Sequence, residues 1–370
     1  MEAIAVSPRE RKVEIIHQTE PKILSPTDVK LRMIEAGVCG TDKEICAFEY
    51  GTPPAGSDQL VIGHESLGEV VEVGPDVARV KIGDLVVPMV RRPCPHDNCV
   101  ACRSDRQDFC FTGDFQERGI KERHGFMAQF VVDDEKYMNP VPKDMRGVAV
   151  LVEPLTIAEK GLMQVWQVQQ RLPWGCPASL GKAAAHCHRA LVLGAGPVGL
   201  LGAMALVNYD FDTYVYSREP APNPKSQLLE SIGAHYISSE THSPEMLPQL
   251  IGNIDLVYEA TGASSLSFEM MKYLGTNGIF IFTGVPGRKG PIEVDTDLMM
   301  RNLVLKNQVV FGTVNAGRES FESSIRDLAT FTKRWPDAVK SLITGRFPMG
   351  DYRELLLEGS RGIKNVITLN

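Results

Sequence analysis

The pattern of apolar and polar positions changes near residue 153 and divides the chain into two parts. Before that point, short β-branched runs at 60–62 and 85–87 are separated by Gly, Pro and Asp. Residues 68–74 (GEVVEVG) alternate polar and apolar positions, as a half-buried strand does. No long helical period is present in this part. The pattern predicts a strand-rich region that folds as an antiparallel, partly open barrel.

After residue 153 the periodicity becomes helical and then alternates between strand and helix. Residues 153–170 have helical spacing, and 171–188, with Pro173, Gly175, Pro177 and Gly181, predict a linker loop. The predicted strands are 189–196, 212–218, 254–262 and 278–284, and the predicted helices are 197–209, 226–234 and 319–335. This alternation predicts a parallel, doubly wound sheet.

The two patterns together predict an α/β protein with two domains. A catalytic domain is expected over 1–186 and 318–370, with a linking helix at about 154–170, and a dinucleotide-binding Rossmann domain over 187–317. The length of 370 residues agrees with two domains at roughly 100–200 residues each.

Composition and charge exclude several classes of function. The chain has 43% hydrophobic and 23% charged residues, which is typical of a globular protein. A net charge of -7, without a basic run, argues against a nucleic-acid partner. The N-terminus lacks the pattern of a signal peptide, and no apolar stretch reaches about 18 residues. We therefore expect no membrane partner and a cytoplasmic, reducing location.

A glycine-rich turn is the strongest cofactor signal. Gly194, Gly196 and Gly199 have the G-x-G-x-x-G spacing between an apolar strand and an apolar helix. The first glycine permits the tight turn, the second lets the backbone approach a pyrophosphate, and the third allows close packing of helix and strand. The helix N-terminus then offers free N–H groups to the phosphates. The sequence predicts a bound nicotinamide dinucleotide.

The end of the next predicted strand bears on the choice between NADP and NAD. Enzymes specific for NAD place an acidic residue there to bind the ribose 2′-hydroxyl. This chain has Ser217 and Arg218, which suit a 2′-phosphate and favour NADP. Glu219 follows directly and leaves use of NAD open. The alternative interpretation of Arg218 is a solvated loop charge.

A first set of metal ligands is indicated by Cys39, His64 and the later carboxylate Glu153. Taken singly, a histidine or a cysteine is more often a core residue. A thiolate, an imidazole and a carboxylate together suit tetrahedral zinc with one position open for substrate. Zinc held in this way is a Lewis acid that lowers the pKa of a substrate hydroxyl. Thr41 is the candidate for relaying the proton.

A second set is formed by four clustered cysteines. Cys94, Cys99, Cys102 and Cys110 have the spacing Cys-x4-Cys-x2-Cys-x7-Cys, and four thiolates around zinc make a closed, structural site. His96 lies in the first gap and is the alternative to Cys94 as first ligand. The other alternative is four reduced cysteines without a metal.

One motif resembles a known family. Residues 63–77 match GHExxGxxxxxGxxV, which is similar to the signature of the zinc-containing medium-chain dehydrogenases/reductases, and the resemblance runs over nearly the whole chain. It implies a GroES-like fold for the catalytic domain. Further segments resemble the zinc-dependent glucose dehydrogenases of that superfamily: 90–95, 106–110, 115–130, 151–161 and 312–321.

The resemblance implies roles for individual residues. Around the catalytic zinc it places Cys39, His64, Glu65 and Glu153; direct binding by Glu65 stays open. Against the sugar hydroxyls it places Thr41, Glu117, Glu153 and Asn315. In the cofactor site it adds Pro197, Val198, Thr283, Gly284, Val285, Thr313, Val314 and Asn315. Buried sugar hydroxyls need paired donors and acceptors, which agrees with these residue types. Without the resemblance, Glu117 and Asn315 would be interpreted as a surface charge and a turn residue.

The function implied is oxidation of an aldose at C1, with D-glucose and NADP giving gluconolactone and NADPH. A zinc dehydrogenase acting on a polyol or on threonine is the alternative, and a non-catalytic NADP-binding scaffold is a distant one. Relatives of this kind often form tetramers, so a homotetramer or dimer is expected. The sequence assigns no role to Cys46, Cys176 and the triplet 186–188 (HCH), which are interpreted as packing or linker residues.

Overall fold

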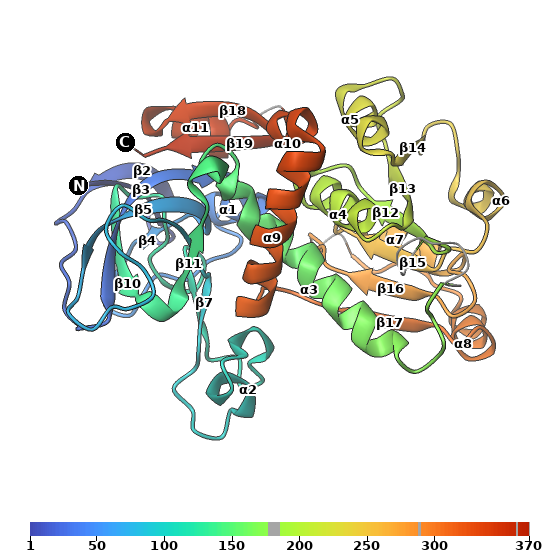
Figure 1. Ribbon diagram of the computed structural model, residues 1–370, viewed down its shortest axis with the longest axis horizontal. Coiled ribbons are helices and arrows are strands. Elements are labelled where there is room, and N and C mark those ends of the chain that lie inside the picture. Colours follow the sequence, from blue (N-terminus) through green and yellow to red (C-terminus); the bar gives the residue numbers. More distant parts are fainter. Residues whose placement is uncertain (177–185, 288–289, 360–361, 370) are drawn as a thin grey trace. The chain divides into compact units, whose positions relative to one another are not determined.

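The computed structural model of the protein describes residues 1–176, 186–287, 290–359 and 362–369, and the chain forms two compact units (Figure 1). Unit 1 comprises 1–156, 315–332 and 339–370, and unit 2 comprises 157–314 and 333–338. The expected domains 1–186 and 318–370 differ from unit 1 mainly in the linking helix, because the division lies near the start of that helix. Pro177 and Gly181 of the predicted linker lie outside the described residues.

Unit 1 is built on β-sheets, as the strand-rich pattern predicts. A seven-stranded sheet has the order β11-β6-β5-β3-β19-β18, with β10 paired to β3, and a smaller sheet has the order β2-β1-β4. A third sheet, β7-β8-β9, consists of three short strands. The strands are β1 (Glu2–Ser7), β2 (Lys12–His17), β3 (Asp28–Gly37), β4 (Leu60–Val61), β5 (Glu65–Val73), β6 (Leu85–Pro88), β7 (Arg91–Arg92), β8 (Gln116–Arg118), β9 (Glu122–Arg123), β10 (Phe130–Asp134), β11 (Met138–Val141), β18 (Ile343–Pro348) and β19 (Lys364–Thr368). Their inward side chains, among them Ile4, Leu31 and Val70, form one buried core.

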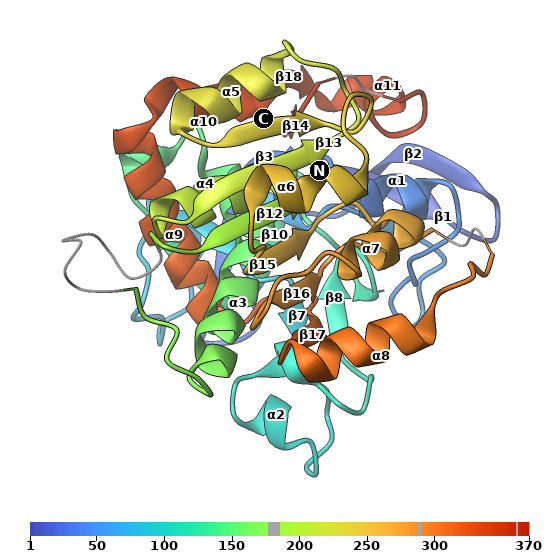
Figure 2. The same ribbon diagram turned by 90° about the vertical axis from the view of Figure 1, so that its right-hand side faces the viewer.

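Unit 2 contains a six-stranded sheet in which every strand pairing is parallel, with the order β14-β13-β12-β15-β16-β17 (Figure 2). The strands are β12 (Arg189–Leu193), β13 (Asp212–Ser217), β14 (His235–Ser238), β15 (Leu256–Glu259), β16 (Ile279–Phe282) and β17 (Val309–Gly312). The chain order reverses between β12 and β15, and this reversal makes the switch point at which such sheets bind dinucleotides. The predicted doubly wound fold is confirmed.

The helices carry the connections. They are α1 (Gly40–Cys46), α2 (Val100–Arg103), α3 (Val152–Gln169), α4 (Pro197–Asn208), α5 (Pro224–Ile232), α6 (Leu247–Ile251), α7 (Ser264–Met271), α8 (Thr296–Leu305), α9 (Arg318–Arg334), α10 (Pro336–Leu342) and α11 (Tyr352–Leu356). Helix α4 contacts β12, β13 and α5, and its residues 199–207 are all buried. The helix predicted at 153–170 is α3, and that at 319–335 is α9. In the described part of the chain, no helix has the length and apolar character needed to cross a bilayer.

One pair of cysteines was not foreseen from the sequence. Cys176 and Cys187 form a disulfide, with their Cα atoms 5.7 Å apart, so the interpretation of both as plain linker residues is wrong. The ring of His188 stacks on Trp174 with centroids 4.3 Å apart, and its Nε2 atom lies 2.7 Å from the Trp174 carbonyl oxygen. The spacing of two cysteines along the chain does not determine how close they lie in the folded protein. Cys46, by contrast, is a buried packing residue, as expected.

Candidate active site

Three potential metal ligands converge where the ends of several elements of unit 1 meet. Cys39 is the N-cap of α1, His64 lies between β4 and β5, and Glu65 opens β5. Strand pairing places Gly37 opposite Glu65, which brings the end of β3 to the start of β5. Gly63 turns the chain before His64 with φ of 91°, a left-handed conformation that glycine adopts without strain. One ligand atom from each of Cys39, His64 and Glu65 lies within 4.8 Å of the other two.

Asp42 supports two of these residues and was missed by the sequence analysis. Its side chain is fully buried; Oδ1 lies 3.4 Å from His64 Nδ1, and Oδ2 accepts a hydrogen bond of 2.9 Å from the Cys39 N–H. Burial alone would lower the pKa of His64, but Asp42 and Cys39 raise that pKa above its ordinary value. A carboxylate behind a metal-binding histidine orients the ring and increases its basicity. Asp42 is placed for this role.

Lys364, at the start of β19, is a second residue that the sequence analysis missed. Its Nζ atom donates to Glu65 Oε2 at 2.5 Å and to the Val38 carbonyl oxygen at 3.2 Å, and all of its side chain except 2% is buried. Burial would lower the pKa of Lys364, but Glu65 and Cys39 outweigh burial and raise it. Lys364 and Glu65 therefore form a buried ion pair.

Glu153 lies on the first turn of α3 and is 7% exposed. Its carboxylate is not among the three ligand groups whose atoms lie within 4.8 Å of one another. Burial raises the pKa of Glu153 to about 7; His64 opposes this shift and Glu65 reinforces it. The pKa of Glu153 is therefore influenced by the charges of His64 and Glu65. Its role as a zinc ligand stays a prediction.

We call these residues the Cys39 cluster: Cys39, Asp42, His64, Glu65, Glu153 and Lys364. It buries three carboxylates with one ammonium group and one imidazole, and buried charge is unfavourable unless it is balanced. Sulfur, imidazole nitrogen and carboxylate oxygen are the donors that zinc takes in catalytic sites. The residues present therefore fit a divalent zinc ion. Thr41, in the first turn of α1, is half-buried.

Glu117 and Asn315, 198 residues apart in sequence, meet in unit 1. Asn315 Nδ2 donates to Glu117 Oε1 at 2.9 Å. Arg91, a third residue that the sequence analysis missed, donates to the same oxygen from Nε at 3.1 Å and from Nη2 at 2.9 Å. Glu117 is 6% exposed, so its alternative interpretation as a surface charge is wrong. Asn315 is 9% exposed and lies in a bend with φ of 58°, as a turn residue does, but it is buried against Glu117. Glu117 Oε2 has no hydrogen bond to the residues that the structure describes and is available to a ligand.

The four clustered cysteines come together around α2, in a lobe that projects beyond β7 (Figure 1). The sulfur atoms of Cys94, Cys99, Cys102 and Cys110 all lie within 4.8 Å of one another. His96 is not in this set, since its Nε2 lies 2.7 Å from Asp114 Oδ2 on the surface. Burial raises the pKa of Cys110, but hydrogen bonds from Thr112 and Cys102 outweigh it and lower the pKa to about 6. Four sulfur ligands would fill every coordination position of a zinc ion, which is typical of a structural zinc site.

The glycine turn of unit 2 has the geometry that its spacing predicts. Gly194 has φ of 101°, and a Cβ atom on Gly199 would overlap the Gly194 carbonyl group. Gly196 is the N-cap of α4, and a Cβ atom there would meet nothing within 4 Å. Packing does not require glycine at this position, so the open space beside Gly196 fits the close approach of a pyrophosphate at the helix N-terminus. Pro197 and Val198 follow as the first residues of α4.

The end of β13 presents Ser217 and the exposed Arg218. Arg218 forms no ion pair with any residue in the described ranges. The carboxylate of Glu219, the candidate ligand for the NAD ribose, is held by Lys225 Nζ at 2.5 Å. Arg218 is therefore available to bind an anionic group such as the 2′-phosphate of NADP, whereas the Glu219 carboxylate, the group that would bind the ribose hydroxyl of NAD, is paired with Lys225.

The remaining predicted cofactor residues lie in loops that are held by partly buried hydrogen bonds. The Glu259 carboxylate accepts from the backbone N–H groups of Thr261 (2.6 Å), Gly262 (2.8 Å) and Gly284 (3.0 Å), and was missed by the sequence analysis. Thr283 and Val285 flank Gly284. Further along, Thr313 Oγ1 accepts from Gln164 and the Val314 carbonyl oxygen from Lys160. Asn315 belongs to unit 1, so its cofactor contact stays a prediction.

Comparison with known families agrees with both halves of the chain. Residues 25–143 match the alcohol dehydrogenase GroES-like domain, and residues 146–369 match the family described as glucose dehydrogenase C-terminus. The glucose 1-dehydrogenase of Methanocella arvoryzae is 37% identical over 370 residues, covering 100% of this chain and 99% of the relative. That of Thermoproteus tenax is 37% identical over 369 residues, covering 99% of each.

A solved structure extends this likeness to the fold. Haloferax mediterranei glucose dehydrogenase, in complex with NADP, Zn and gluconolactone, has a TM-score of 0.88 and 31% identity, covering 100% of this chain and 99% of the other. Family domains and full-length relatives thus agree along the whole sequence. The chain belongs to the glucose dehydrogenase family of the zinc-containing medium-chain dehydrogenases/reductases.

Proposed function

We propose that this protein oxidises D-glucose at C1 with NADP to give gluconolactone and NADPH. The observation that carries the proposal is the buried Glu117–Asn315 pair, in the unit that also holds the Cys39 cluster. The likeness to a dehydrogenase whose structure holds NADP, Zn and gluconolactone supports it.

The residues of the Cys39 cluster would hold the zinc ion. Cys39 and His64 are its first ligands, with a carboxylate from Glu65 or Glu153 as the third. The bound zinc supplies Lewis acidity that makes a substrate hydroxyl more acidic. Asp42, whose Oδ1 lies 3.4 Å from His64 Nδ1, would orient the His64 ring, and Lys364 pairs with Glu65. The Thr41 hydroxyl would accept and pass on the substrate proton.

The sugar hydroxyls would be recognised by groups that are already oriented. Arg91 and Asn315 both donate to Glu117 Oε1, which fixes the carboxylate and leaves Oε2 to accept from a hydroxyl. Asn315 Oδ1 accepts from the Ala316 N–H at 2.8 Å, so the amide is also fixed. A substrate without the matching hydroxyl would leave a buried carboxylate oxygen unpaired, which costs free energy.

For the cofactor we propose NADP in preference to NAD, with Arg218 binding the 2′-phosphate and the turn at 194–199 binding the pyrophosphate. Two finer points belong to the same proposal. A homotetramer or dimer is expected in solution, which light scattering would measure. A cytoplasmic location stays a prediction from the sequence, because six cysteines are free thiols whereas Cys176 and Cys187 form a disulfide, a bond typical of oxidising compartments.

The decisive experiment is a screen of aldoses and polyols with NADP and with NAD, following absorbance of the reduced nicotinamide. We expect glucose with NADP to have the highest kcat/KM. Glu117→Gln should raise the KM for glucose about tenfold, because a hydrogen bond to a charged group contributes about 1.5–3 kcal/mol. Glu10→Gln, at an exposed glutamate between β1 and β2, is the control and should leave the KM unchanged. Oxidation of polyols or threonine with no response to Glu117→Gln would support the alternative dehydrogenase instead.

A further inference from the structure

The short strands β7 and β8 carry different chemistry on their two faces. Their antiparallel register places Arg91 opposite Glu117 and Arg92 opposite Gln116. Successive residues of a strand point to opposite faces, and directly paired residues share one. Arg91 and Glu117 form the candidate sugar-binding face. Arg92 and Gln116, together with Arg118, therefore belong to the other face.

That second face gathers three arginines around one carboxylate, which we call the Asp133 cluster. Asp133 Oδ2 accepts from Arg92 Nη2 at 2.5 Å and from Arg118 Nε at 2.8 Å, and Oδ1 accepts from Arg123 Nη2 at 3.1 Å. Strand β9 contributes Arg123, which is paired with Arg118 in the register. Three guanidinium groups against one carboxylate leave two positive charges without a counter-charge in the cluster.

Two of the three arginines are buried, Arg123 keeps 35% of its side chain exposed, and the hydrogen bonding of the group is incomplete. Arg92 is 3% and Arg118 is 6% exposed. The Nε atoms of Arg92 and Arg123 are buried and have no hydrogen-bond partner among the residues that the structure describes. Burial, together with Arg92 and Arg123, lowers the pKa of Arg118 to about 10 although Asp133 opposes the shift. A cluster of this kind is stabilised by an anion.

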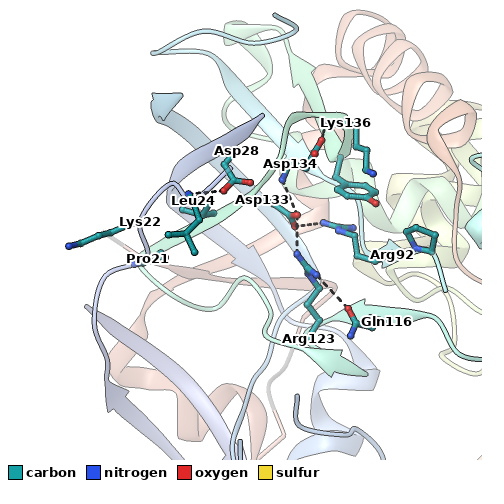
Figure 3. A pocket seen from close by; sticks show the side chains of 13 residues that line it. Pro21, Lys22, Leu24, Asp28, Arg92, Gln116, Arg123, Asp133, Asp134 and Lys136 are labelled. Carbon is teal, nitrogen blue, oxygen red and sulfur yellow. Dashed lines mark hydrogen bonds and ion pairs between the residues drawn. The ribbon is translucent and has the colours of Figure 1, made fainter. Parts of the chain in front are cut away.

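A pocket of about 590 Å³ opens beside the cluster, within the size range of small-molecule sites. Figure 3 shows Arg92 and Arg123 reaching Asp133 from two directions, with Gln116 beside Arg123, while Lys22 points away from them. Lys136 adds an exposed ammonium group to the lining. The donors that face this space are therefore mostly cationic.

The two other carboxylates that line the pocket are already engaged. Asp28 Oδ2 accepts from the N–H groups of Leu24 and Ser25, and Asp134 accepts from the Lys136 N–H and the Thr27 hydroxyl. These neutral donors leave both carboxylates charged, so the pocket and the cluster together hold five cationic side chains against three carboxylates, which still leaves a surplus of two positive charges: Lys22, Arg92, Arg118, Arg123 and Lys136 against Asp28, Asp133 and Asp134. This argues against a cation as the natural occupant.

We propose that this pocket binds a phosphoryl group through Arg92, Arg123, Gln116 and Lys136. Guanidinium groups match phosphate oxygens in geometry, and a phosphoryl group at neutral pH carries roughly -1.5 to -2 charges, close to the surplus in the cluster. Free inorganic phosphate and the phosphate monoester of a small metabolite share this chemistry. The pocket is distinct from the turn at 194–199, which belongs to unit 2.

Occupancy has a consequence for the sugar side, which rests on the function proposed above. Arg91 and Arg92 are neighbours on a two-residue strand, and Gln116 and Glu117 are neighbours on the strand that pairs with it. An anion that fixes Arg92 and Gln116 also fixes the backbone that positions Arg91 and Glu117. We expect bound phosphate to change the KM for glucose more than it changes kcat.

Calorimetric titration of the zinc-loaded enzyme, saturated with NADP, tests the binding directly. The probes are inorganic phosphate and glycerol 3-phosphate. Saturable binding is expected for the native protein. It should be about tenfold weaker in Arg123→Gln and about threefold weaker in Lys136→Gln, because a charge-assisted hydrogen bond contributes more to binding than an exposed ion pair does. Arg9→Gln, which removes an exposed arginine paired with Asp58, is the control and should bind as the native protein does.

The outcomes separate the possibilities. Tighter binding of inorganic phosphate identifies free phosphate as the occupant, and tighter binding of the ester identifies a phosphate monoester. Equal affinity supports recognition of the phosphoryl group alone. Absence of saturable heat up to about 10 mM of either probe overturns the proposal, as does unchanged affinity in both Arg123→Gln and Lys136→Gln. If Arg123→Gln does not fold, the exposed Lys136→Gln carries the test. Binding without sugar oxidation would contradict only the proposed function.

Discussion

The Cys39 cluster and the Asp133 cluster both bury several charges in unit 1, but with opposite surplus. The Cys39 cluster has carboxylates from Asp42, Glu65 and Glu153 against the ammonium group of Lys364 and an imidazole. The Asp133 cluster has three guanidinium groups against one carboxylate. The same unit therefore contains one buried site that a cation stabilises and one that an anion stabilises.

Each cluster contains a buried residue of the opposite charge that is hydrogen-bonded to its surplus charges. Lys364 forms an ion pair with Glu65, and Asp133 forms ion pairs with three arginines: Arg92, Arg118 and Arg123. Each of these two residues therefore balances part of the buried charge of its cluster. Removing a partner from a buried ion pair is far more costly than never having had the pair. The ligand residues of the Cys39 cluster should therefore control activity, whereas Asp133 should control stability.

The largest effect is expected from His64→Asn. The variant removes an imidazole ligand, and kcat should fall by about 10³ or more, because zinc contributes several kcal/mol to the transition state. Zinc content should fall from about two ions per chain to about one, since the four-cysteine site remains. Activity assays and elemental analysis measure both quantities.

His96→Asn is the matched control, because His96 lies on the surface beside Asp114. It should retain both activity and zinc. Loss of zinc in His96→Asn would show that this histidine is a structural ligand after all. Full activity in His64→Asn would remove the basis of the proposed site.

The second largest effect is expected from Asp133→Asn, and it should appear in stability rather than in metal content. The substitution leaves the buried guanidinium groups of Arg92 and Arg118, and the half-buried one of Arg123, without their carboxylate, and the free energy of unfolding should fall by about 3 kcal/mol or more. Urea denaturation measures the loss. Asp58→Asn, at an exposed pair with Arg9, is the control and should change stability by less than about 1 kcal/mol. Equal stability of the two variants would remove the distinction between the clusters.

A smaller effect is expected from Asp42→Asn, which alters support for the metal ligands without removing one. Loss of the carboxylate behind His64 should weaken zinc binding by about 10–100-fold, as measured by competition with a chelator. Glu44→Gln, on the same helix α1, is the control. An unchanged zinc affinity in Asp42→Asn would show that Asp42 only caps helix α1 and does not support the metal ligands.

The elements and motifs that depend on local pattern could be predicted from the sequence. Strand β5 follows from the alternation at 68–74, and the turn at Gly194 follows from spacing and flanking apolar segments, because both signals lie within about ten residues. The convergence of Cys39, His64 and Glu65 was indicated by donor chemistry together with the family resemblance. The meeting of Glu117 and Asn315 was implied by that resemblance alone.

Residues that act through distant contacts could not be predicted. Lys364 lies 299 residues from Glu65, and its local sequence resembles that of any exposed lysine before a strand. Arg91 and Arg92 look alike in sequence, and only the pairing with β8 assigns them to different faces. Asp42 had a detectable signal, because an acidic residue three positions after an N-cap is typical of a helix start. The pairing of Cys176 with Cys187 had none, since it depends on the path of the chain between them.

The smallest predicted effect, the pH dependence of stability, separates the two clusters by charge. Burial would raise the pKa of Asp133, but Arg118, Arg92 and Arg123 outweigh burial and hold that pKa far below its ordinary value of 3.8. A carboxyl whose pKa is lower in the folded state stabilises the fold fully above its unfolded pKa, and loses this contribution as pH falls towards the folded value. The difference in unfolding free energy between the native protein and Asp133→Asn should thus be constant from about pH 6 to 8 and shrink below about pH 4, by about 1.4 kcal/mol per pH unit. Urea titrations of both proteins across this range measure the difference, in which the other carboxyl groups cancel. A gap that stays constant down to about pH 3 would show that Asp133 acts through packing, because a shape effect does not titrate.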